Sequence, residues 1–297
     1  MTNKILVTGA SGFVGKHTLA PLIERGYEVY AVSRKPGPEI VGVTWVTADL
    51  LDQAQRRALI ARIKPSHMLH AAWYAEHSKF WHAAENIDWL AASLDLVRCF
   101  IACGGKRIVG IGSCAEYDWQ SAQGGTFAEN APCQPATIYG KTKLSLMTMM
   151  EALAKQSNIS YAWARLFFMF GPDEPPAKLV ASVIASLKQD KAALCSSGNQ
   201  LRDFSHVADI GKALAGVMAS QVTGPINVAS GRAVTIAHVA KMIGEITGKA
   251  ALVQLGALPD RPGEAEIIVA DTHKLQQEAL YVFPPLRQRL CEVIGDV

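Results

Sequence analysis

The stretch KILVTGASGFVG, residues 4–15, decides the fold of this chain. Its first five residues form a short β-rich run, which predicts a strand, and the periodic apolar residues after it predict a helix. Gly9 allows a tight turn between the two, Gly12 lets the backbone approach a pyrophosphate, and Gly15 lets the helix pack close to the strand. Free backbone amides at the start of such a helix bind phosphate groups. The stretch therefore predicts a dinucleotide-binding unit.

Strand and helix patterns go on alternating up to residue 170. The predicted strands cover residues 27–33, 43–48, 67–72, 107–112 and 160–168, and the predicted helices cover residues 52–63, 83–103 and 138–156. Alternation of this kind makes the strands parallel and places helices on both faces of the sheet. We therefore expect an α/β fold with a doubly wound parallel Rossmann sheet.

The stretch GPDEPP, residues 171–176, ends this regular alternation. The remainder contains predicted helices at 179–188 and 236–247, predicted strands at 225–229 and 267–269, and a mixed segment at 202–218. We expect residues 1–170 to form the dinucleotide-binding domain, with returns to it near 204–229. Residues 171–297 are expected to form mainly a smaller, discontinuous C-terminal lobe that binds the substrate.

Tyr139 and Lys143 stand four residues apart in a predicted helix, so they face the same side of it. A phenol exchanges protons poorly near neutral pH, but an ammonium beside it favours the phenolate and lowers its pKa. Ser113 follows the predicted strand at 107–112 and offers a hydroxyl that can steady a reacting oxygen. These three residues are predicted to be catalytic. The alternative is a tyrosine and a lysine on an ordinary solvated helix face.

Length, composition and charge are those of a globular enzyme. The chain has 297 residues, 49% hydrophobic and 19% charged, enough for a generous core. A net charge of +3 with no run of Lys or Arg argues against a nucleic-acid partner. The chain begins MTNK directly before the first strand, and no apolar run approaches membrane-spanning length. We therefore expect a cytoplasmic protein without a secretion signal or membrane segment.

The cysteines and histidines predict no metal site. Cys99 and Cys103 share a helix face without further ligands, which favours helix packing, and His67 and His70 fall in a predicted strand. Six dispersed cysteines in a chain of this length do not indicate a disulfide framework.

Taken together, the motifs resemble those of the extended short-chain dehydrogenase/reductases, also called the NAD-dependent epimerase/dehydratase family. In chain order they are Gly9-x-x-Gly12-x-x-Gly15, Ser113 with Tyr117, Tyr139-x-x-x-Lys143, the stretch Arg165 to Pro172, Arg202-Asp203-Phe204, Asp209 and Arg261-Pro262-Gly263. The resemblance covers nearly the whole chain. It implies a nucleotide-activated sugar as substrate and a C-terminal lobe that closes over the sugar.

The resemblance also implies how a nicotinamide cofactor is held. Asp49 is similar to the family residue that contacts adenine, and the stretch around Ala71 and Ala72 is similar to the one beside the cofactor's sugars and phosphates. Lys143 would bind the nicotinamide ribose. The full set of predicted cofactor-binding residues is Gly9, Ser11, Gly12, Phe13, Val14, Gly15, Ser33, Arg34, Asp49, Leu50, Ala71, Ala72, Tyr139 and Lys143.

Arg34 points to the form of that cofactor. Dinucleotide sites that prefer NAD carry an acid at the end of the second strand, where it bonds the ribose 2′-hydroxyl. This chain has Ser33-Arg34-Lys35 instead, a hydroxyl and two cations that suit a 2′-phosphate. We therefore predict NADP(H), with NAD as the weaker candidate. The alternative is that these residues form only a solvated loop.

Two arginines resemble the family's ligands for the nucleotide diphosphate. Arg202 and Arg261, together with Ser113, are the predicted substrate-binding residues, because an arginine fork matches phosphate oxygens. The alternative for either arginine is an ordinary salt bridge. Four aromatic residues after the fourth predicted strand either line a sugar pocket or pack in the core; they are Trp73, Tyr74, Trp81 and Trp89.

Two departures from the family pattern narrow the reaction. Sugar dehydratases of the family carry an Asp-Glu pair directly after the catalytic hydroxyl, whereas this chain has Cys114 and Ala115 there, and Glu116 comes one residue too late. Dehydration is therefore disfavoured. Many members also carry an asparagine where Phe168 stands, so that phosphate contact must be supplied differently.

The predicted function is NADPH-dependent reduction of a nucleotide-activated keto sugar, an NDP-4-keto-6-deoxyhexose, with Tyr139 as proton donor. The alternative is an NDP-sugar 4-epimerase with tightly bound NAD, since both share the catalytic triad. A more distant alternative is a non-catalytic protein that senses the dinucleotide. By resemblance, the helices predicted at 83–103 and 138–156 would form the interface of a homodimer.

Overall fold

Seven parallel strands form the main sheet of this computed structural model, which describes residues 3–121, 125–278 and 280–295. The strand order is β10-β6-β5-β4-β1-β2-β3. Their bounds are β1 (Lys4–Thr8), β2 (Glu28–Ser33), β3 (Val43–Thr47), β4 (His67–His70), β5 (Arg107–Ser113), β6 (Ser160–Leu166) and β10 (Gly224–Val228). The expected start of the chain at Met1 and Thr2, and its end at 297, lie outside the described residues.

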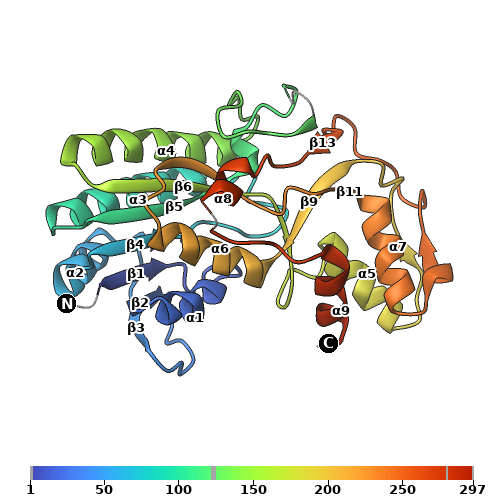
Figure 1. The fold of residues 1–297 in the computed structure, drawn as a ribbon, viewed down its shortest axis with the longest axis horizontal. Helices are drawn as coiled ribbons and strands as arrows, with labels where there is room; N and C mark the ends of the chain where they lie inside the picture. The colour runs from blue at the N-terminus through green and yellow to red at the C-terminus, as the bar shows by residue number, and fades with distance from the viewer. Residues whose placement is uncertain (1–2, 122–124, 279, 296–297) are drawn as a thin grey trace.

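Helices cover both faces of this sheet (Figure 1). On one face α1 (Lys16–Glu24) packs against α6 (Val207–Ala219), over a core that contains Leu19 and Leu214. On the other face lie α2 (Gln53–Ile63), α3 (Glu85–Ala102) and α4 (Ile138–Ser157). The predicted doubly wound Rossmann sheet is therefore confirmed. Because strand order reverses between β1 and β4, the carboxyl ends of these two strands border the crevice in which such sheets bind ligands.

The C-terminal part of the chain builds a second, smaller sheet and its own core, seen beyond β9 in Figure 1. Its sheet joins β7 (Phe168–Phe170), β9 (Leu201–His206), β11 (Ala233–Thr235) and β13 (Ile267–Ile268). A two-stranded sheet pairs β8 (Ala193–Leu194) with β12 (Val253–Gln254). Among the described residues, the further helices are η1 (Cys114–Glu116), α5 (Leu179–Lys188), α7 (Ile236–Ile246), η3 (Ala250–Leu252), α8 (His273–Gln277) and α9 (Leu286–Gly295).

The division of the chain into a dinucleotide-binding domain and a substrate-binding lobe stays a prediction. β10 and α6 belong to the main sheet and its covering layer, although they follow β7 and α5 in sequence. In the parts of the chain that the structure describes, every helix is too short or too polar to cross a membrane.

Two predicted strands end two residues earlier than expected, for identifiable reasons. The strand predicted at 67–72 stops at His70, because β1 ends at Thr8: the amide of Ala71 donates to both the carbonyl and the hydroxyl of Thr8, and the amide of Ala72 donates to that hydroxyl. The strand predicted at 160–168 leaves the main sheet after Leu166, and the chain then pairs with β9 as β7. Both breaks lie at the carboxyl edge of the main sheet, where the candidate site is found.

Candidate active site

The glycine turn between β1 and α1 is crowded on one side and has free amides on the other. A Cβ on Gly9, whose φ is +65°, would lie 2.7 Å from the amide nitrogen of Ala72. A Cβ on Gly15 would lie 2.1 Å from the carbonyl oxygen of Gly9. The amides of Phe13 and Val14 donate no hydrogen bond to any described residue, and no side chain caps the helix that follows. These free donors fit the phosphates of a dinucleotide.

Gly12 and Ser11 complete the predicted phosphate-binding turn. Gly12 donates its amide to the carbonyl of Gly9 at 2.9 Å, and a Cβ on Gly12 would lie 3.1 Å from that oxygen. Ser11 is exposed beside it. The turn is therefore closed by its own backbone and leaves its outer edge to solvent.

A buried polar chain, missed by the sequence analysis, supports this turn from beneath. The Thr8 hydroxyl hydrogen-bonds His70 Nδ1 at 2.8 Å, and His70 Nε2 hydrogen-bonds the Ser93 hydroxyl at 2.8 Å. Burial, with a smaller effect of the nearby Lys143 charge, lowers the pKa of His70 to about 3. His70 is therefore a neutral tether between β1, β4 and α3. The available signal was a threonine and a histidine at the ends of otherwise apolar strands.

Ser113, Tyr139 and Lys143 meet at the carboxyl end of β5. Ser113 is the last residue of that strand, and its side chain lies close enough to the hydroxyl of Tyr139 to lower the pKa of that phenol. α4 begins one residue before Tyr139, and its N-cap Thr137 accepts a hydrogen bond from the amide of Gly140 at 3.1 Å. A Cβ on Gly140 would lie 2.3 Å from the carbonyl oxygen of Ala115, so glycine lets this helix approach η1 closely.

Lys143 points to the strand and not to the phenol oxygen. Its Nζ donates to the carbonyl oxygen of Ile111 at 2.8 Å and lies 3.9 Å from the centre of the Trp73 ring. The same atom is 5.9 Å from the centre of the Tyr139 ring. With an exposed fraction of 3%, Lys143 is buried beneath the indole. A cation over an aromatic face is stabilised by the ring's electrons.

The electrostatics differ from the sequence-based argument, which predicted a lowered pKa for Tyr139. Burial raises the pKa of Tyr139 well above its usual value, and the hydrogen bond from Ser113 opposes that rise. Burial also lowers the pKa of Lys143 to about 7, and the charge of Glu116 opposes that shift. The prediction was wrong for this structure because the ammonium is engaged by Ile111 and Trp73. At neutral pH Tyr139 is a neutral phenol, able to give a proton.

Aromatic rings surround Tyr139. Phe80 and Trp81 meet its ring edge-on, with ring centres 4.9 and 5.8 Å away, and Trp119 packs against Trp81. The amide of Tyr139 also donates to the carbonyl of Trp81 at 3.1 Å. Sequence analysis missed Phe80 and Trp119, because they come from different loops.

The four aromatic residues singled out in the sequence separate into two pairs. Trp73 and Trp81 lie beside the triad, and Trp73 donates its indole N–H to Asn86 at 2.8 Å. Trp89 packs against the core under α3, and the Tyr74 hydroxyl bonds to Glu76 near the surface. Trp73 and Trp81 therefore lie beside the triad, whereas Trp89 packs in the core and Tyr74 lies near the surface.

The residues predicted to hold the adenosine end follow two adjacent strands. Ser33 and Thr47 are paired in β2 and β3, so Arg34 and Asp49 extend from neighbouring strand ends. The Ser33 hydroxyl donates to the carbonyl of Lys35, whereas the Arg34 side chain is exposed. Leu50 is buried, and Asp49 accepts the amide of Leu51 at 2.9 Å. An exposed arginine at this position is free to meet a ligand.

The two arginines predicted to bind the diphosphate differ in burial and in their partners. Arg202, in β9, is only 2% exposed; it donates to Glu264 at 2.9 Å and lies over the ring of Phe168. Arg261 is exposed and makes no ion pair with another described residue. The structure therefore pairs Arg202 with the side chain of Glu264, whose amide in turn donates to the carbonyl of Arg261 at 3.4 Å.

Comparison with known proteins agrees with this geometry. The NAD dependent epimerase/dehydratase family matches residues 5–229. The chain belongs to this family. Its membership confirms the resemblance seen in the motifs and places the chain among NAD(P)-dependent sugar-nucleotide oxidoreductases and epimerases. Within the described residues, no three His, Cys, Asp or Glu side chains are grouped so that they could hold a metal ion.

Individual relatives cover most of the chain. It is 26% identical to a UDP-glucose 4-epimerase of Bacillus subtilis, over 92% of this chain and 90% of that protein. It is also 26% identical to a dTDP-6-deoxy-L-talose 4-dehydrogenase (NAD(P)(+)) of Kitasatospora kifunensis, over 88% of this chain and 84% of that protein. In fold it is similar to the UDP-glucose 4-epimerase of Thermus thermophilus in complex with NAD, with a TM-score of 0.86, 21% identity and 98% of each chain covered.

Proposed function

We propose that this protein is an NADPH-dependent reductase of a nucleotide-activated keto sugar, an NDP-4-keto-6-deoxyhexose. The observation that carries this proposal is the meeting of Ser113, Tyr139 and Lys143 beside the glycine turn. A relative acting on dTDP-6-deoxy-L-talose at carbon 4 supports the sugar class.

The chain's own groups handle the proton and the oxygen. When bound, NADPH supplies a hydride to the ketone carbon. Tyr139 gives its phenolic proton to the ketone oxygen, so that one C–H and one O–H bond form and an alcohol results. The hydroxyl of Ser113 donates a hydrogen bond to that oxygen as negative charge develops on it. Lys143, cationic below a pH of about 7, would stabilise the phenolate that remains once its ammonium leaves the carbonyl of Ile111.

The neutral phenol favours the direction of reduction. Burial keeps the proton on Tyr139 at neutral pH, and the rings of Phe80 and Trp81 keep water from its ring. A proton donor is what a ketone requires, whereas alcohol oxidation requires the phenolate.

The cofactor form is proposed from the residues after β2. Arg34 is exposed just after β2, and its charge suits a ribose 2′-phosphate. Phe13 and Val14 would meet the pyrophosphate with their free amides. Arg202 and Arg261 would meet the substrate's diphosphate, the former after exchanging Glu264 for a phosphate.

The second candidate is an NDP-sugar 4-epimerase with tightly bound NAD. The UDP-glucose 4-epimerase relative supports it as strongly as the dehydrogenase relative supports the first. Arg34 favours the reductase, because an epimerase recycles one retained NAD and gains nothing from a 2′-phosphate site.

A substrate screen separates the two. Purified protein is given NADPH or NADH with several NDP-4-keto-6-deoxy sugars, and in parallel UDP-glucose without added cofactor. Loss of nicotinamide absorbance with a keto sugar supports the reductase. Interconversion of UDP-glucose and UDP-galactose without net cofactor change supports the epimerase and overturns our proposal.

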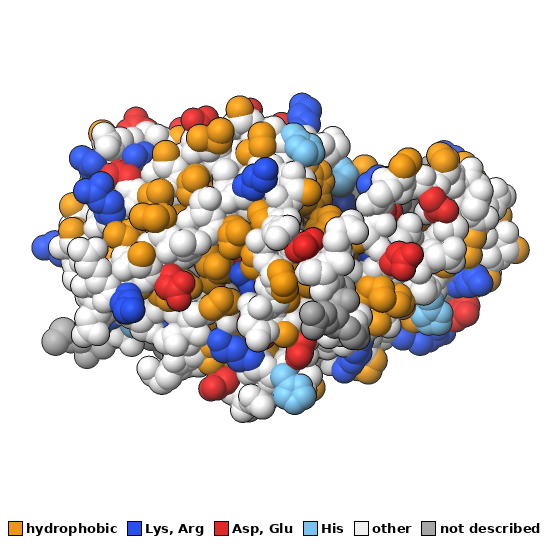
Figure 2. Space-filling view, turned by 90° about the horizontal axis from the view of Figure 1, so that it is seen from above, with side chains coloured by type: hydrophobic (Ala, Val, Ile, Leu, Met, Phe, Trp, Pro, Cys, Tyr) orange, Lys and Arg blue, Asp and Glu red, His pale blue; other side chains and the backbone are white. Residues whose placement is uncertain are grey.

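We also propose a homodimer through α3 and α4. The two helices pack side by side, and each exposes a large apolar residue, Ile87 at 58% and Met149 at 46%. Figure 2 shows hydrophobic side chains gathered over the surface seen from above, the side on which α4 lies in Figure 1. Light scattering that gives the mass of a monomer at micromolar concentration would contradict the dimer.

A further inference from the structure

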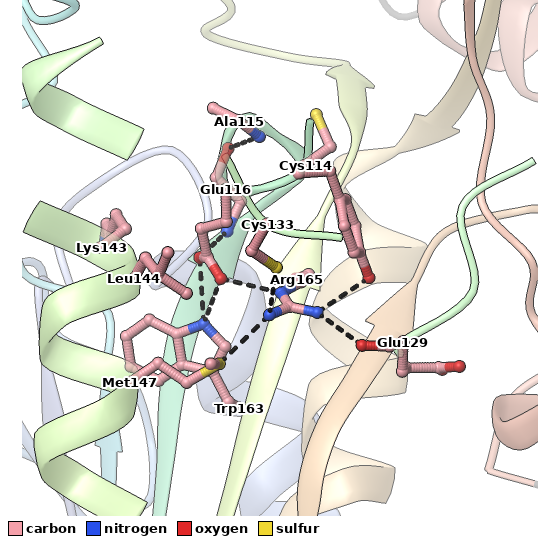
Figure 3. A network of polar contacts seen from close by, with 12 residues as sticks. Cys114, Ala115, Glu116, Glu129, Cys133, Lys143, Leu144, Met147, Trp163 and Arg165 are labelled. Carbon is pink, nitrogen blue, oxygen red and sulfur yellow. Dashed lines mark hydrogen bonds and ion pairs between the residues drawn. The ribbon is translucent and has the colours of Figure 1, made fainter. Parts of the chain in front are cut away.

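Glu116 is a fully buried carboxylate three residues after Ser113, with an exposed fraction of 0%. It receives the amide of Ser113 at 2.8 Å, the indole N–H of Trp163 at 3.0 Å and Nε of Arg165 at 2.8 Å (Figure 3). Together with the Ser113 side chain, it forms a capping box around η1. Its position in the sequence is unsuitable for dehydration, and nothing in the proposed reaction uses it.

Glu116 and Lys143 each bind the backbone of β5 near its carboxyl end, at positions two residues apart. Lys143 donates to the carbonyl of Ile111, and Glu116 accepts the amide of Ser113. Gly112 lies between them, and a Cβ there would be 2.6 Å from Glu116 Oε1. Figure 3 shows Lys143 on the helix beside this carboxylate. The carboxylate of Glu116, in η1, and the ammonium of Lys143, in α4, therefore both bind the backbone of residues 111–113.

Few other ionisable groups face Lys143. His70, from β4, is neutral, since its pKa is lowered to about 3 by burial. Tyr139, from α4, is a neutral phenol, and Trp73 offers an uncharged ring. Arg165, from β6, is bound to Glu116 by a buried ion pair. Glu116 is the negative charge that acts on Lys143 among the described residues.

We propose that Glu116 is a positioning residue of the triad: it fixes Ser113 through its backbone amide and keeps Lys143 charged inside a dry site. Its relevance to catalysis rests on the proposed function. The effect of Glu116 on the charge of Lys143 does not depend on that function, because this charge can be measured without turnover.

Physical chemistry gives the direction of the effect. Burial disfavours the ammonium and lowers the pKa of Lys143 to about 7, while the carboxylate favours the ammonium and raises that pKa. Without the carboxylate, Lys143 should lose its proton at a lower pH. A single nearby opposite charge typically shifts a pKa by about 1–3 units.

The test is a titration of Lys143 in the full chain by NMR. The ¹³Cε resonance of Lys143 is assigned by its loss in Lys143→Met and followed against pH in the wild type and in Glu116→Gln. We expect the midpoint in Glu116→Gln to fall by roughly 1 pH unit or more. An unchanged midpoint overturns the proposal.

Trp163→Phe is the matched control. It removes one hydrogen-bond donor to Glu116 from the same buried network but keeps the carboxylate and Arg165. Its Lys143 midpoint should stay at the wild-type value. An equal fall in both variants would show that loosening of the network, and not the charge, moves Lys143, and would also overturn the proposal.

Glu116→Gln leaves the Arg165 cation buried without its partner, so this variant is at risk of misfolding. The double variant Glu116→Gln/Arg165→Met removes both charges, and its Lys143 titration is followed by the same NMR measurement. The midpoint should again fall below that of the wild type, by less than in the single variant because a repelling cation is also gone. If a nucleotide-sugar substrate is found, the alkaline limb of the pH profile should move by the same amount.

Discussion

The two sides of the candidate site are held in different ways. On the side of the main sheet, the groups are buried and fully engaged: His70 lies between two hydroxyls, and Glu116 accepts three donors. On the side of the smaller lobe, Arg202 has a partly exposed partner in Glu264, and Arg261 is exposed. The groups proposed to react are therefore held in place before a ligand binds, whereas the arginines proposed to bind the substrate can change partners. We call the side of Ser113, Tyr139 and Lys143 the fixed side, and the side of Arg202 and Arg261 the adjustable side.

The largest effect is expected from Tyr139→Phe, on the fixed side. The change removes the transferable proton but keeps the ring and its edge-on contacts with Phe80 and Trp81. Turnover of a keto sugar should fall by about 10²–10⁴. Tyr74→Phe is the matched control, because that hydroxyl bonds Glu76 near the surface, away from the triad. Near-normal turnover in Tyr139→Phe would end the assignment of this residue.

Arg34→Asp tests the cofactor-binding part of the main sheet. The replacement removes a charged hydrogen-bond donor and introduces a charge that repels a 2′-phosphate. Such hydrogen bonds contribute about 1.5–3 kcal/mol, so the ratio of kcat/KM for NADPH over NADH should fall by at least roughly tenfold. Arg62→Asp, at the exposed end of α2, is the control for added negative charge. A ratio equal to that of the wild type would refute NADP preference.

Gly15→Ala tests whether the fixed side tolerates a single added carbon. The new Cβ would lie 2.1 Å from the backbone oxygen of Gly9, so backbone must move. Overpacking of this kind costs about 1–3 kcal/mol in the free energy of unfolding, measured by urea denaturation. Gly295→Ala, where the added carbon meets open space, should be near neutral. Equal stability of the two variants would show that the turn is looser than its geometry indicates.

The smallest effect is expected from Glu264→Gln, on the adjustable side. The change weakens the ion pair that occupies Arg202 and so frees the guanidinium for a substrate phosphate. Because pairs near the surface contribute up to about 1 kcal/mol, the KM of the nucleotide sugar should fall by no more than roughly fivefold. Glu245→Gln breaks the exposed pair with Arg287 and serves as the control. A raised KM in Glu264→Gln would place Arg202 in a purely structural role.

Sequence patterns predicted the parallel sheet and the glycine turn well and the surroundings of Tyr139 poorly. The glycine spacing and the strand-helix alternation depend on neighbours in the chain, so the parallel sheet could be predicted directly. Phe80 and Trp119 come to Tyr139 from separate loops, and no local pattern indicates such a meeting. The direction of the pKa shift of Tyr139 was missed because it depends on burial and on where the Lys143 ammonium points.

Glu116 shows the same limit of sequence-based prediction. Its position relative to Ser113 was visible in the sequence, but its partners Trp163 and Arg165 lie on β6, far away in the chain. A lone acid after a strand predicts nothing until the neighbouring strand is known.

Transfer of deuterium tests the central claim most directly. The protein is incubated with an NDP-4-keto-6-deoxyhexose and NADPH that carries deuterium at the transferable position, and the product sugar is analysed by mass spectrometry and NMR. We expect one deuterium on the new carbinol carbon for each NADPH oxidised, and a loss of this transfer in Tyr139→Phe. Interconversion of sugars with no deuterium incorporated and no NADPH consumed would contradict a reductase built on Ser113, Tyr139 and Lys143.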